Sequence, residues 1–489
     1  RDRLRSRGLG DVYKRQIKAP VKRAIATWRM HMNLRKRWIS VLVVILVLAA
    51  MIAGITLLTP VSDGMNLLDW HKETIHLWYT DDSLTDYLNN KALDFYNATD
   101  VRVETKLVSG LEYLEAINQA SLSDEETTPD VYILSNDSLE KAYLAGLATP
   151  INNTKTLEDS TLFSQAARNA VSYHGNYVGY PLYFETSALL YNKTYLNQIA
   201  TEAGLENADS LIPSSIADIL TIADQYSTPE NVEYFFRWDV SDIFYNYFFI
   251  GNYISVGGDA GDDKSHIDIY NTQSIASLKV YQEMNQFFSI DTKESSYDSV
   301  IQEFLEGKTI YTIATSDCLK RLEEASRNGE FDYEYGIAKL PDINQDMITK
   351  GMSVTNALVI NGYSGQKDIA NQFVEFLSEQ GSEDLYEMTG KLPARLQTSY
   401  EDDRQLAFVQ NYIDSVPIPK LTETSNFWVE LEICFAKVWD GADANTELRS
   451  LSEQIKTQAA GETYTEEVLE DPQVELLPDT GYEESSDSE

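Results

Sequence analysis

The chain has little cysteine and little histidine for its length of 489 residues. Its two cysteines, Cys318 and Cys434, cannot form the disulfide framework of a small secreted scaffold or a cysteine-rich metal site. They could pair with each other in an oxidising exterior, but we expect two buried thiols that act as small hydrophobic side chains. Since the five histidines are scattered along the chain, we expect no bound metal and no other cofactor.

Catalytic signatures are missing as well. The chain contains no Gly-x-Ser-x-Gly, no His-Glu-x-x-His and no phosphate loop, and these are the motifs that position nucleophiles, zinc ions and nucleotides. The large number of acidic residues supplies many carboxylate pairs, so composition alone leaves a glycosidase open. From the missing motifs we predict that the protein is not an enzyme.

Basic residues become scarce after residue 60. Residues 1–60 carry 13 Lys or Arg and 2 Asp or Glu, whereas residues 61–489 carry 26 Lys or Arg and 75 Asp or Glu. The strongly acidic part repels nucleic acid and anionic lipid headgroups, so nucleic acid is not an expected partner.

Charge is absent from Ile39 to Leu58, which follows the basic cluster Arg35-Lys36-Arg37. Twenty uncharged residues can span a bilayer, and a basic flank keeps the amino end in the cytoplasm. We predict a transmembrane signal anchor at 39–58 that inserts in the lipid bilayer, a cytoplasmic segment at 17–38 and an extracellular region after a linker at 59–73. A cleaved signal peptide is the alternative; the apolar run is longer than usual for one and no small-x-small site closes it.

The two ends of the chain need separate treatment. Residues 1–16 end in Asp11-Val12-Tyr13-Lys14-Arg15-Gln16, which resembles a sequencing adapter read through as protein, so they support no functional argument. Residues 462–489 are acidic without Lys or Arg, and we expect them to be disordered. They include Leu477-Pro478-Asp479-Thr480-Gly481, which spells a cell-wall sorting pentapeptide but lacks the apolar span and basic tail that such a signal needs.

Strand and helix patterns alternate at the start of the extracellular region. They are predicted at residues 74–79, 84–98, 101–105, 111–121 and 130–134, beginning and ending with a strand. This alternation is typical of a parallel α/β sheet, in which ligands lie beyond the carboxyl ends of the strands. Those ends are residues 79–83 and 135–138.

Later motifs resemble one known family. The segment from Gly179 to Lys193 resembles the signature of family 1 extracellular solute-binding proteins, the maltose-binding-protein group. Further matches follow in the family's order at Ile212-Pro213-Ser214-Ser215, Phe304–Lys308, Tyr335–Pro341, Gly390–Arg395 and Ser425–Trp428. The resemblance extends over about residues 74–460.

The resemblance implies an α/β, two-lobe periplasmic-binding-protein-like (type II) fold with central mixed sheets and three hinge crossovers, here preceded by one transmembrane helix. The crossovers are expected near 183–186, 352–356 and 393–396. Lobe 1 would then comprise residues 74–183 and 355–393, and lobe 2 residues 186–352 and 396–461.

The resemblance also implies ligand-binding residues. Glu185 matches a sugar-binding glutamate, although it could be a hinge carboxylate, and Trp428 matches a stacking tryptophan, although it could be buried in the core. Asp137 matches a hydroxyl-binding aspartate or caps the helix at Leu139, and Arg395 could contact either ligand or hinge.

Four more candidates follow from position, Trp238, Asp239, Tyr79 and Asp82, and the resemblance adds Asp317. Asp317 stands where the family has a stacking tryptophan. Leu134 replaces another such tryptophan, and Ser138 and Glu432 replace family arginines. These departures argue against maltose itself, while a carbohydrate remains the best ligand class.

We therefore predict a membrane-tethered extracellular substrate-binding protein that closes on a sugar or oligosaccharide and delivers it to the permease subunits of an ABC importer. The alternatives are a surface sugar sensor that signals to a receptor kinase and, less favoured, a carbohydrate-active enzyme.

Overall fold

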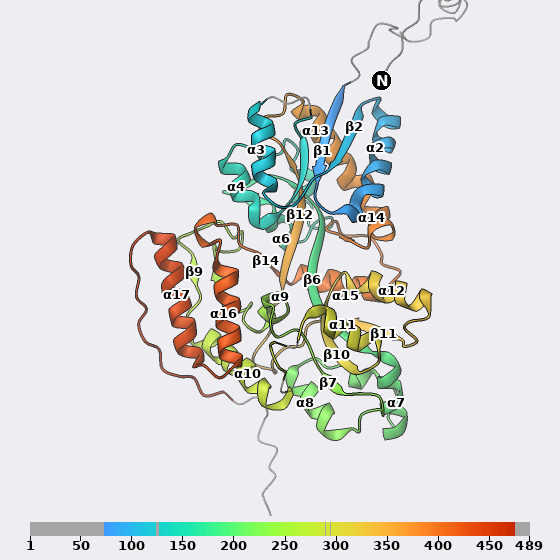
Figure 1. The fold of residues 1–489 in the computed structure, drawn as a ribbon, viewed down its shortest axis with the longest axis vertical. Helices are drawn as coiled ribbons and strands as arrows, with labels where there is room; N and C mark the ends of the chain where they lie inside the picture. Colours follow the sequence, from blue (N-terminus) through green and yellow to red (C-terminus); the bar gives the residue numbers. More distant parts are fainter. Residues whose placement is uncertain (1–72, 124–126, 289, 294, 475–489) are drawn as a thin grey trace, which may run out of the picture. The chain divides into compact units, whose positions relative to one another are not determined.

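A mixed β-sheet runs through the centre of the molecule and joins two lobes (Figure 1). The computed structural model describes residues 73–123, 127–288, 290–293 and 295–474. The sheet strands, in their order across it, are β2 (Arg102–Leu107), β1 (Thr74–Tyr79), β3 (Val131–Ser135), β12 (Met352–Ile360), β6 (Tyr180–Asn192), β10 (Thr309–Thr315) and β7 (Tyr234–Phe236). Three more strands pair outside this path: β11 (Tyr335–Ala338) and β13 (Leu392–Pro393) with β6, and β14 (Val416–Pro417) with β12.

Strand β6 belongs to both lobes. Residues 180–186 pair with β12, and residues 187–192 pair with β10 and β11. The register between β6 and β12 shifts at Asn356/Ala357, opposite Pro181, which has no N–H to donate to a regular ladder. Because both of its faces are covered, nearly all of this strand is buried.

Lobe 1 follows from the two-residue alternation of its strands. Ile75, Leu77 and Tyr79 of β1 pack under one layer of helices, and Trp78 packs under the opposite layer. The helices of this lobe are η1 (Asp82–Leu84), α2 (Thr85–Thr99), α3 (Tyr113–Ser123), η2 (Asn136–Ser138), α4 (Leu139–Leu144), α5 (Lys155–Glu158), α6 (Gln165–Ala170), α13 (Lys367–Phe376), η5 (Leu377–Gly381) and α14 (Ser382–Thr389). A hairpin of β4 (Ser172–Tyr173) and β5 (Asn176–Tyr177) follows α6 in the chain.

Lobe 2 is built around a second apolar core that includes Trp238, Tyr281 and Trp439. Its helices are α7 (Lys193–Ala203), η3 (Asp209–Leu211), α8 (Ile216–Gln225), α9 (Ile243–Asn246), η4 (Tyr247–Phe249), α10 (Thr272–Phe288), α11 (Tyr297–Leu305), α12 (Cys318–Asn328), η6 (Thr422–Thr424), α16 (Phe427–Trp439) and α17 (Ala444–Ala460). The hairpin of β8 (Ser255–Val256) and β9 (Ile267–Asp268) completes the lobe.

Helix α15 (Asp403–Ile413) lies where the lobes meet. It packs on β6 and on β11, and Tyr412 stacks on Phe184 of β6 at 4.0 Å between ring centroids. The same buried cluster continues from α2 and α13 through β6 to α12. The two lobes therefore share apolar core along β6.

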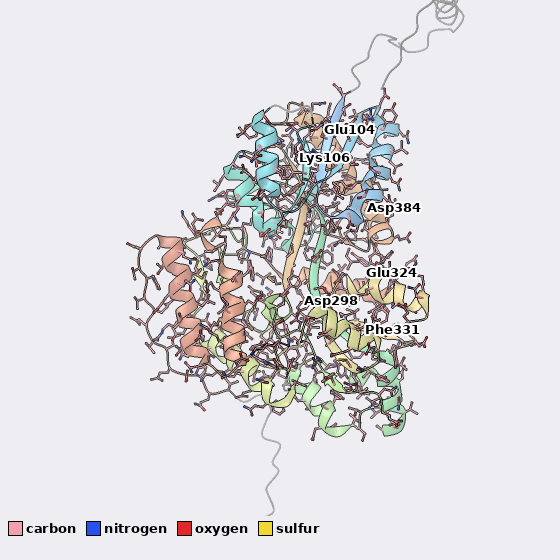
Figure 2. The ribbon with its side chains drawn as sticks, viewed as in Figure 1. Glu104, Lys106, Asp298, Glu324, Phe331 and Asp384 are labelled. Atoms are coloured by element: carbon pink, nitrogen blue, oxygen red, sulfur yellow. The ribbon has the colours of Figure 1, made fainter. Side chains whose placement is uncertain are left out.

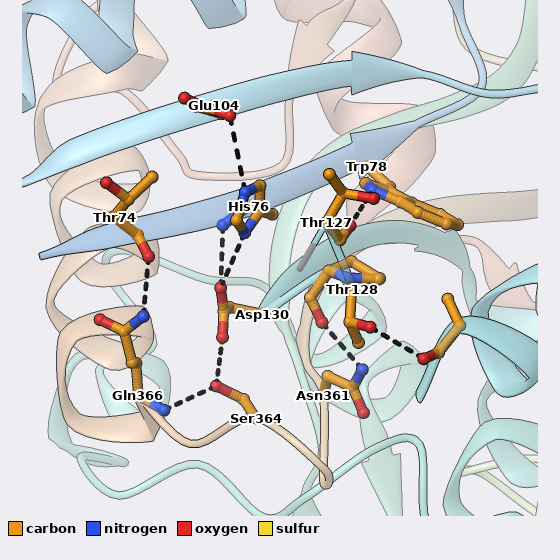
Figure 3. Close-up of polar contacts among 12 residues, drawn as sticks. Thr74, His76, Trp78, Glu104, Thr127, Thr128, Asp130, Asn361, Ser364 and Gln366 are labelled. Atoms are coloured by element: carbon orange, nitrogen blue, oxygen red, sulfur yellow. Dashed lines mark hydrogen bonds and ion pairs between the residues drawn. The ribbon is translucent and has the colours of Figure 1, made fainter. Parts of the chain in front are cut away.

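A polar network fixes the amino-terminal edge of lobe 1 (Figure 3). The backbone N–H of His76 donates to the Asp130 carboxylate at 2.9 Å, and the His76 ring lies between Asp130, at 3.7 Å, and Glu104, at 3.5 Å. Ser364 donates to the other Asp130 oxygen at 2.6 Å. These contacts tie β1 to β2, to β3 and to the segment before α13.

The structure confirms the predicted two-lobe α/β fold with a mixed sheet. The first five predicted elements occur as β1, α2, β2, α3 and β3, with ends shifted by at most two residues. Cys318 and Cys434 are buried free thiols, as expected.

Two predictions differ from the structure. The chain at 393–396 stays with lobe 1, because β13 pairs with β6 at Tyr183 and Phe184; it reaches lobe 2 later, along α15 and β14. Residues 462–474 were expected to be disordered but run back along α17 and α10. Glu466 lies 2.6 Å from Lys456, and Asp471 lies 3.0 Å from Lys279. Paired with lysines in this way, the acidic residues hold the segment in place.

The predicted membrane anchor at 39–58 lies outside the described residues. Within the part of the chain that the structure describes, no helix has the length and apolar character needed to cross a bilayer.

Candidate functional site

A cavity of about 560 Å³ opens between the two lobes. This volume lies within the range of small-molecule sites. Residues from lobe 1, lobe 2 and the connecting strands line it: Glu185, Asp242, Ile243, Phe244, Tyr245, Tyr297, Thr315, Asp317, Met352, Lys391, Ile418 and Trp428.

The lobe 1 wall centres on Lys391, which precedes β13. Its Nζ lies 3.0 Å from the Asp81 carboxylate and 3.2 Å from the Glu185 carboxylate. Asp81 follows β1 and accepts from the N–H and hydroxyl of Ser83, which fixes its orientation. Burial by itself would lower the pKa of Lys391, but attraction from Glu185 and Asp81 outweighs burial, so the pKa is raised and the lysine stays charged.

The lobe 2 wall is aromatic. The rings of Tyr245 and Tyr297 stack with 4.7 Å between centroids and 16° between planes. Trp428, near the start of α16, is half-buried. Its ring packs against those of Tyr247 and Phe427, with 5.5 Å and 4.9 Å between ring centroids. Burial raises the pKa of both Tyr245 and Tyr297, so their hydroxyls remain protonated and can donate hydrogen bonds.

Asp317 forms the polar end of this wall. Its carboxylate accepts from the Tyr297 hydroxyl at 3.0 Å and from the Thr315 hydroxyl. The Tyr297 oxygen lies 2.8 Å from the Thr315 hydroxyl oxygen and accepts from the Thr315 backbone N–H at 3.3 Å. The three side chains form a closed hydrogen-bonded group at the start of α12, next to the cavity.

A second group of carboxylates consists of Asp242, which lines the cavity, and of Asp239 and Glu432 behind it. Asp242 lines the cavity and caps α9 by accepting from the N–H of Phe244 at 2.8 Å. Burial, together with the neighbouring charge of Asp239, raises the pKa of Asp242. Burial also raises the pKa of Glu432, which accepts weakly from the N–H of Ile243 at 3.4 Å and faces Asp242 and Asp239.

Three of the nine predicted residues line the cavity: Glu185, Trp428 and Asp317. They arrive from β6, α16 and the end of β10, so the tertiary structure brings together positions that are more than 100 residues apart. Asp239 lies just behind the surface, where it accepts from the N–H and the hydroxyl of Ser241.

Trp238 and Tyr79 do not line the cavity. Trp238 is fully buried in lobe 2, where its indole N–H donates to Asn246 at 2.8 Å and its ring packs on Phe236. Tyr79 is buried in lobe 1, and its hydroxyl donates to Thr85. Both aromatics were proposed from position along the chain, but the alternation of β1 directs Tyr79 to the core of lobe 1, and Trp238, two residues after β7, packs in the core of lobe 2.

The other three predicted residues are also outside the cavity lining. Asp82 is exposed on η1, while its neighbour Asp81 faces Lys391. Asp137 accepts from Ser135 within the η2 turn, and Arg395 donates to the Ser378 carbonyl at 3.0 Å inside lobe 1.

Sequence reasoning missed five lining or adjacent residues: Asp81, Asp242, Tyr245, Tyr297 and Lys391. Asp81 could have been found, because it also follows the first strand. Lys391 lies inside the quoted motif Gly390–Arg395. Tyr245 and Tyr297 carry no local signal, because among 30 tyrosines only their spatial pairing distinguishes them.

Comparisons with known proteins agree with this geometry. The family model described as bacterial extracellular solute-binding protein matches residues 91–407. The maltodextrin-binding protein MdxE of Bacillus subtilis (strain 168) is 21% identical over 397 residues, covering 77% of this chain and 89% of that protein.

Solved structures show the same fold. An extracellular solute-binding protein from Staphylococcus aureus in complex with maltose has a TM-score of 0.67 at 18% identity, covering 80% of this chain and 98% of that one. The maltose-binding protein MalE of Listeria monocytogenes, also in complex with maltose, has a TM-score of 0.64 at 22% identity, covering 81% and 100%.

Proposed function

The chain belongs to the family of bacterial extracellular solute-binding proteins, and from this membership we propose that its cleft captures a carbohydrate and delivers it to the permease of an ABC importer. The observation that carries the proposal is the cavity of about 560 Å³, whose walls combine aromatic rings with carboxylates and hydroxyls. Aromatic rings stack on the apolar faces of sugars, and carboxylates accept from their hydroxyl groups. A relative named for maltodextrin and solved structures with maltose support the same ligand class.

Each wall has a proposed role. Trp428 provides a stacking face, because its half-buried ring lines the cavity and is held by Tyr247 and Phe427. Glu185 and Asp317 accept hydrogen bonds from ligand hydroxyls. Lys391 donates to ligand oxygens while Asp81 keeps its ammonium in position.

Ligand capture proceeds by lobe closure about the strands that connect the lobes. The ligand favours the closed form only through its higher affinity for that form. The permease then recognises the closed arrangement of the two lobes.

The same proposal places the protein on the extracellular face of the cell membrane, tethered by Ile39–Leu58. The family supports the extracellular location, and the uncharged run after a basic cluster supports the tether. Protease treatment of intact cells should remove the region after Pro60 and leave the segment before Ile39 protected. A secreted form that begins near Thr59 would rule out the tether.

Small-angle scattering with malto-oligosaccharides and other short saccharides tests the binding function. A bound saccharide should reduce the radius of gyration of the protein, raise its melting temperature and be recovered intact by mass spectrometry. Hydrolysis of the saccharide would favour the enzyme alternative. If no saccharide in a broad set is bound, the proposed ligand class is wrong.

A further inference from the structure

The cavity wall carries more negative than positive charge. Among the lining residues that the structure describes, three are carboxylates, Glu185, Asp242 and Asp317, and one is a cation, Lys391. A ligand that enters this cavity leaves bulk water, so uncompensated charge on the wall acts on it with little screening. The positions of the charges therefore bear on which saccharides fit.

Lys391 serves the lobe 1 wall alone. Its Nζ contacts both Asp81, at 3.0 Å, and Glu185, at 3.2 Å. With two carboxylates at contact distance, this ammonium is already compensated. It is not in contact with Asp242 or Asp317.

Asp317 is hydrogen-bonded only through hydroxyl groups in the contacts described above. Two arginines on other parts of the fold, Arg321 of α12 and Arg404 of α15, have other partners. Arg321, one turn further along α12, contacts Asp298 at 2.8 Å, and Asp298, labelled in Figure 2, lies in the first turn of α11 beside Tyr297. Arg404 makes a two-pronged contact with Asp402 at 2.6–3.0 Å.

Asp242 faces further negative groups. Asp239 and Glu432 stand behind it, and burial with the Asp239 charge raises its pKa. Burial is the larger cause of the raised pKa and the Asp239 charge adds to it; a ligand cation placed beside these carboxylates would offset their mutual repulsion.

The aromatic rings complete a site for a cation. Tyr245 and Tyr297 form a stacked pair that lines the same cavity as Asp242, Asp317, Phe244 and Trp428, and the Tyr297 hydroxyl donates to Asp317 at 3.0 Å. Aromatic faces attract ammonium groups, and the attraction increases when the site excludes water. Carboxylates next to such faces accept the ammonium N–H groups in charge-assisted hydrogen bonds.

We propose that the cleft selects saccharides that carry a protonated amine, amino sugars or their short oligomers, with the ammonium group held by Asp242 and Asp317 beside the Tyr245–Tyr297 pair. The inference rests on the proposed function as a carbohydrate receptor and specifies its ligand class. A uronic acid is disfavoured by the same walls, because its carboxylate would face carboxylates.

Binding of three β-1,4-linked disaccharides to the purified full chain tests the proposal by calorimetry at pH 6: glucosamine disaccharide, its N,N′-diacetylated form and cellobiose, with maltotriose alongside. The free-amine disaccharide should bind at least 10-fold more tightly than the neutral saccharides, and the preference should shrink with added salt. Equal or tighter binding of the diacetylated form, cellobiose or maltotriose would overturn this inference and leave the carbohydrate function intact. Lack of binding by every saccharide would overturn both.

Isosteric variants locate the charge. Asp317→Asn and Asp242→Asn should each reduce the affinity for the free-amine disaccharide at least 10-fold more than they reduce the affinity for cellobiose, so that the preference for the amine is lost. Asp298→Asn is the matched control, because this exposed carboxylate contacts Arg321 and is not part of the cavity lining. If both cavity variants retain the preference for the amine, the proposed ammonium site is wrong.

Discussion

Lys391 and Lys420 both lie where lobe 1 meets lobe 2, and both have carboxylates nearby, but their pKa values shift in opposite directions. Lys391 contacts Asp81 and Glu185 directly at the cavity wall, and its pKa is raised. Lys420 follows β14, its side chain is 1% exposed, and burial lowers its pKa to about 8.

The contacts of Lys420 explain the difference. Its Nζ donates to two main-chain carbonyls, Asn169 of α6 at 2.8 Å and Ala260 of the loop between β8 and β9. Asp262 and Glu140 attract the charge without contacting it closely enough to offset the loss of hydration. Carbonyl dipoles orient a buried ammonium group, but only a carboxylate in contact compensates its charge.

Neighbouring contacts extend this second junction between the lobes. The N–H of His174, in the turn between β4 and β5, donates to Asp262 at 2.7 Å. Glu140 of α4 accepts from Tyr173 at 3.0 Å and from the N–H of Thr422. Lobe 1 is thus tied to the β8–β9 loop and to the segment after β14 by contacts whose centre, Lys420 and Glu140, is buried.

The two lysines mark regions with different roles, ligand binding at the cavity wall and stability at the Lys420 junction. At the cavity wall, half-exposed charged pairs can exchange partners with a ligand at small cost. At the Lys420 junction, buried groups have no partner but each other, so a change there acts on stability. Substitutions in the two regions should therefore differ both in what they change and in how much.

The largest effect is expected for Lys420→Ala. The substitution leaves the Asn169 and Ala260 carbonyls without their donor and leaves Asp262 and Glu140 without a nearby cation. A buried acceptor left without its donor costs about 1–3 kcal/mol of unfolding free energy, so the loss of both contacts should be measurable by urea denaturation. Lys264→Ala is the control, because this exposed lysine has only a long contact of 3.4 Å to Glu423. Equal stability of the two variants would show that the junction contributes nothing.

Alkaline pH should stabilise the protein through Lys420. Its folded pKa of about 8 lies below the roughly 10.4 of an unfolded lysine, so between these values the folded state binds fewer protons and the free energy of unfolding rises with pH. The difference in unfolding free energy between wild type and Lys420→Ala should widen by about 3 kcal/mol from pH 7.5 to 10.5. A difference that stays constant with pH would contradict the lowered pKa of Lys420.

Lys391 has the opposite sign. Its contribution to stability is present below the ordinary lysine pKa and is lost as pH rises through its higher folded pKa.

Trp428→Ala should affect binding more than folding. Loss of a stacking face in the cavity weakens saccharide binding by about 2 kcal/mol, while the half-buried side chain contributes little to the melting temperature. Trp439→Ala provides the contrast, because that ring is buried in lobe 2 and its removal costs about 3–5 kcal/mol of stability. Wild-type affinity in Trp428→Ala would place the ligand elsewhere.

The smallest effect is expected for Lys391→Met. Its pairs with Asp81 and Glu185 are partly solvent-screened, so the loss at pH 7 should be about 1 kcal/mol or less. Burial opposes ionisation of Asp81, but hydrogen bonds from Ser83 and attraction from Lys391 lower its pKa overall. This stabilisation is present above the ordinary carboxyl pKa and is lost as pH falls through the folded one. The difference between wild type and variant should therefore vanish towards pH 3 in acid-unfolding curves. A loss of unfolding free energy as large as that of Lys420→Ala would show that the cavity wall and the Lys420 junction do not differ in their contribution to stability.

Local pattern was sufficient for the first elements of the fold. The strands at β1, β2 and β3 alternate apolar residues with the period of two that a sheet requires, and their predicted ends are close to the observed ones. Glu185, Trp428 and Asp317 were found through the resemblance to the family, which assigns ligand contacts to the matching positions. Trp238 and Tyr79 were misplaced because sequence position does not show which face of an element is covered.

By itself, the sequence determined the α/β class and the acidic character of the chain, because periodicity and composition are properties of short segments, and its motifs indicated two lobes through the resemblance to a known family. Only the tertiary structure decided that Tyr245 stacks on Tyr297, that Lys391 is held between Asp81 and Glu185, and that Lys420 is buried between carbonyls from two lobes. It also decided that residues 462–474 pack on α17 and α10 in spite of their acidic composition. In each case the deciding quantity is the distance between groups far apart in the chain, and that distance sets whether a charge is compensated, a ring is stacked or a segment is held.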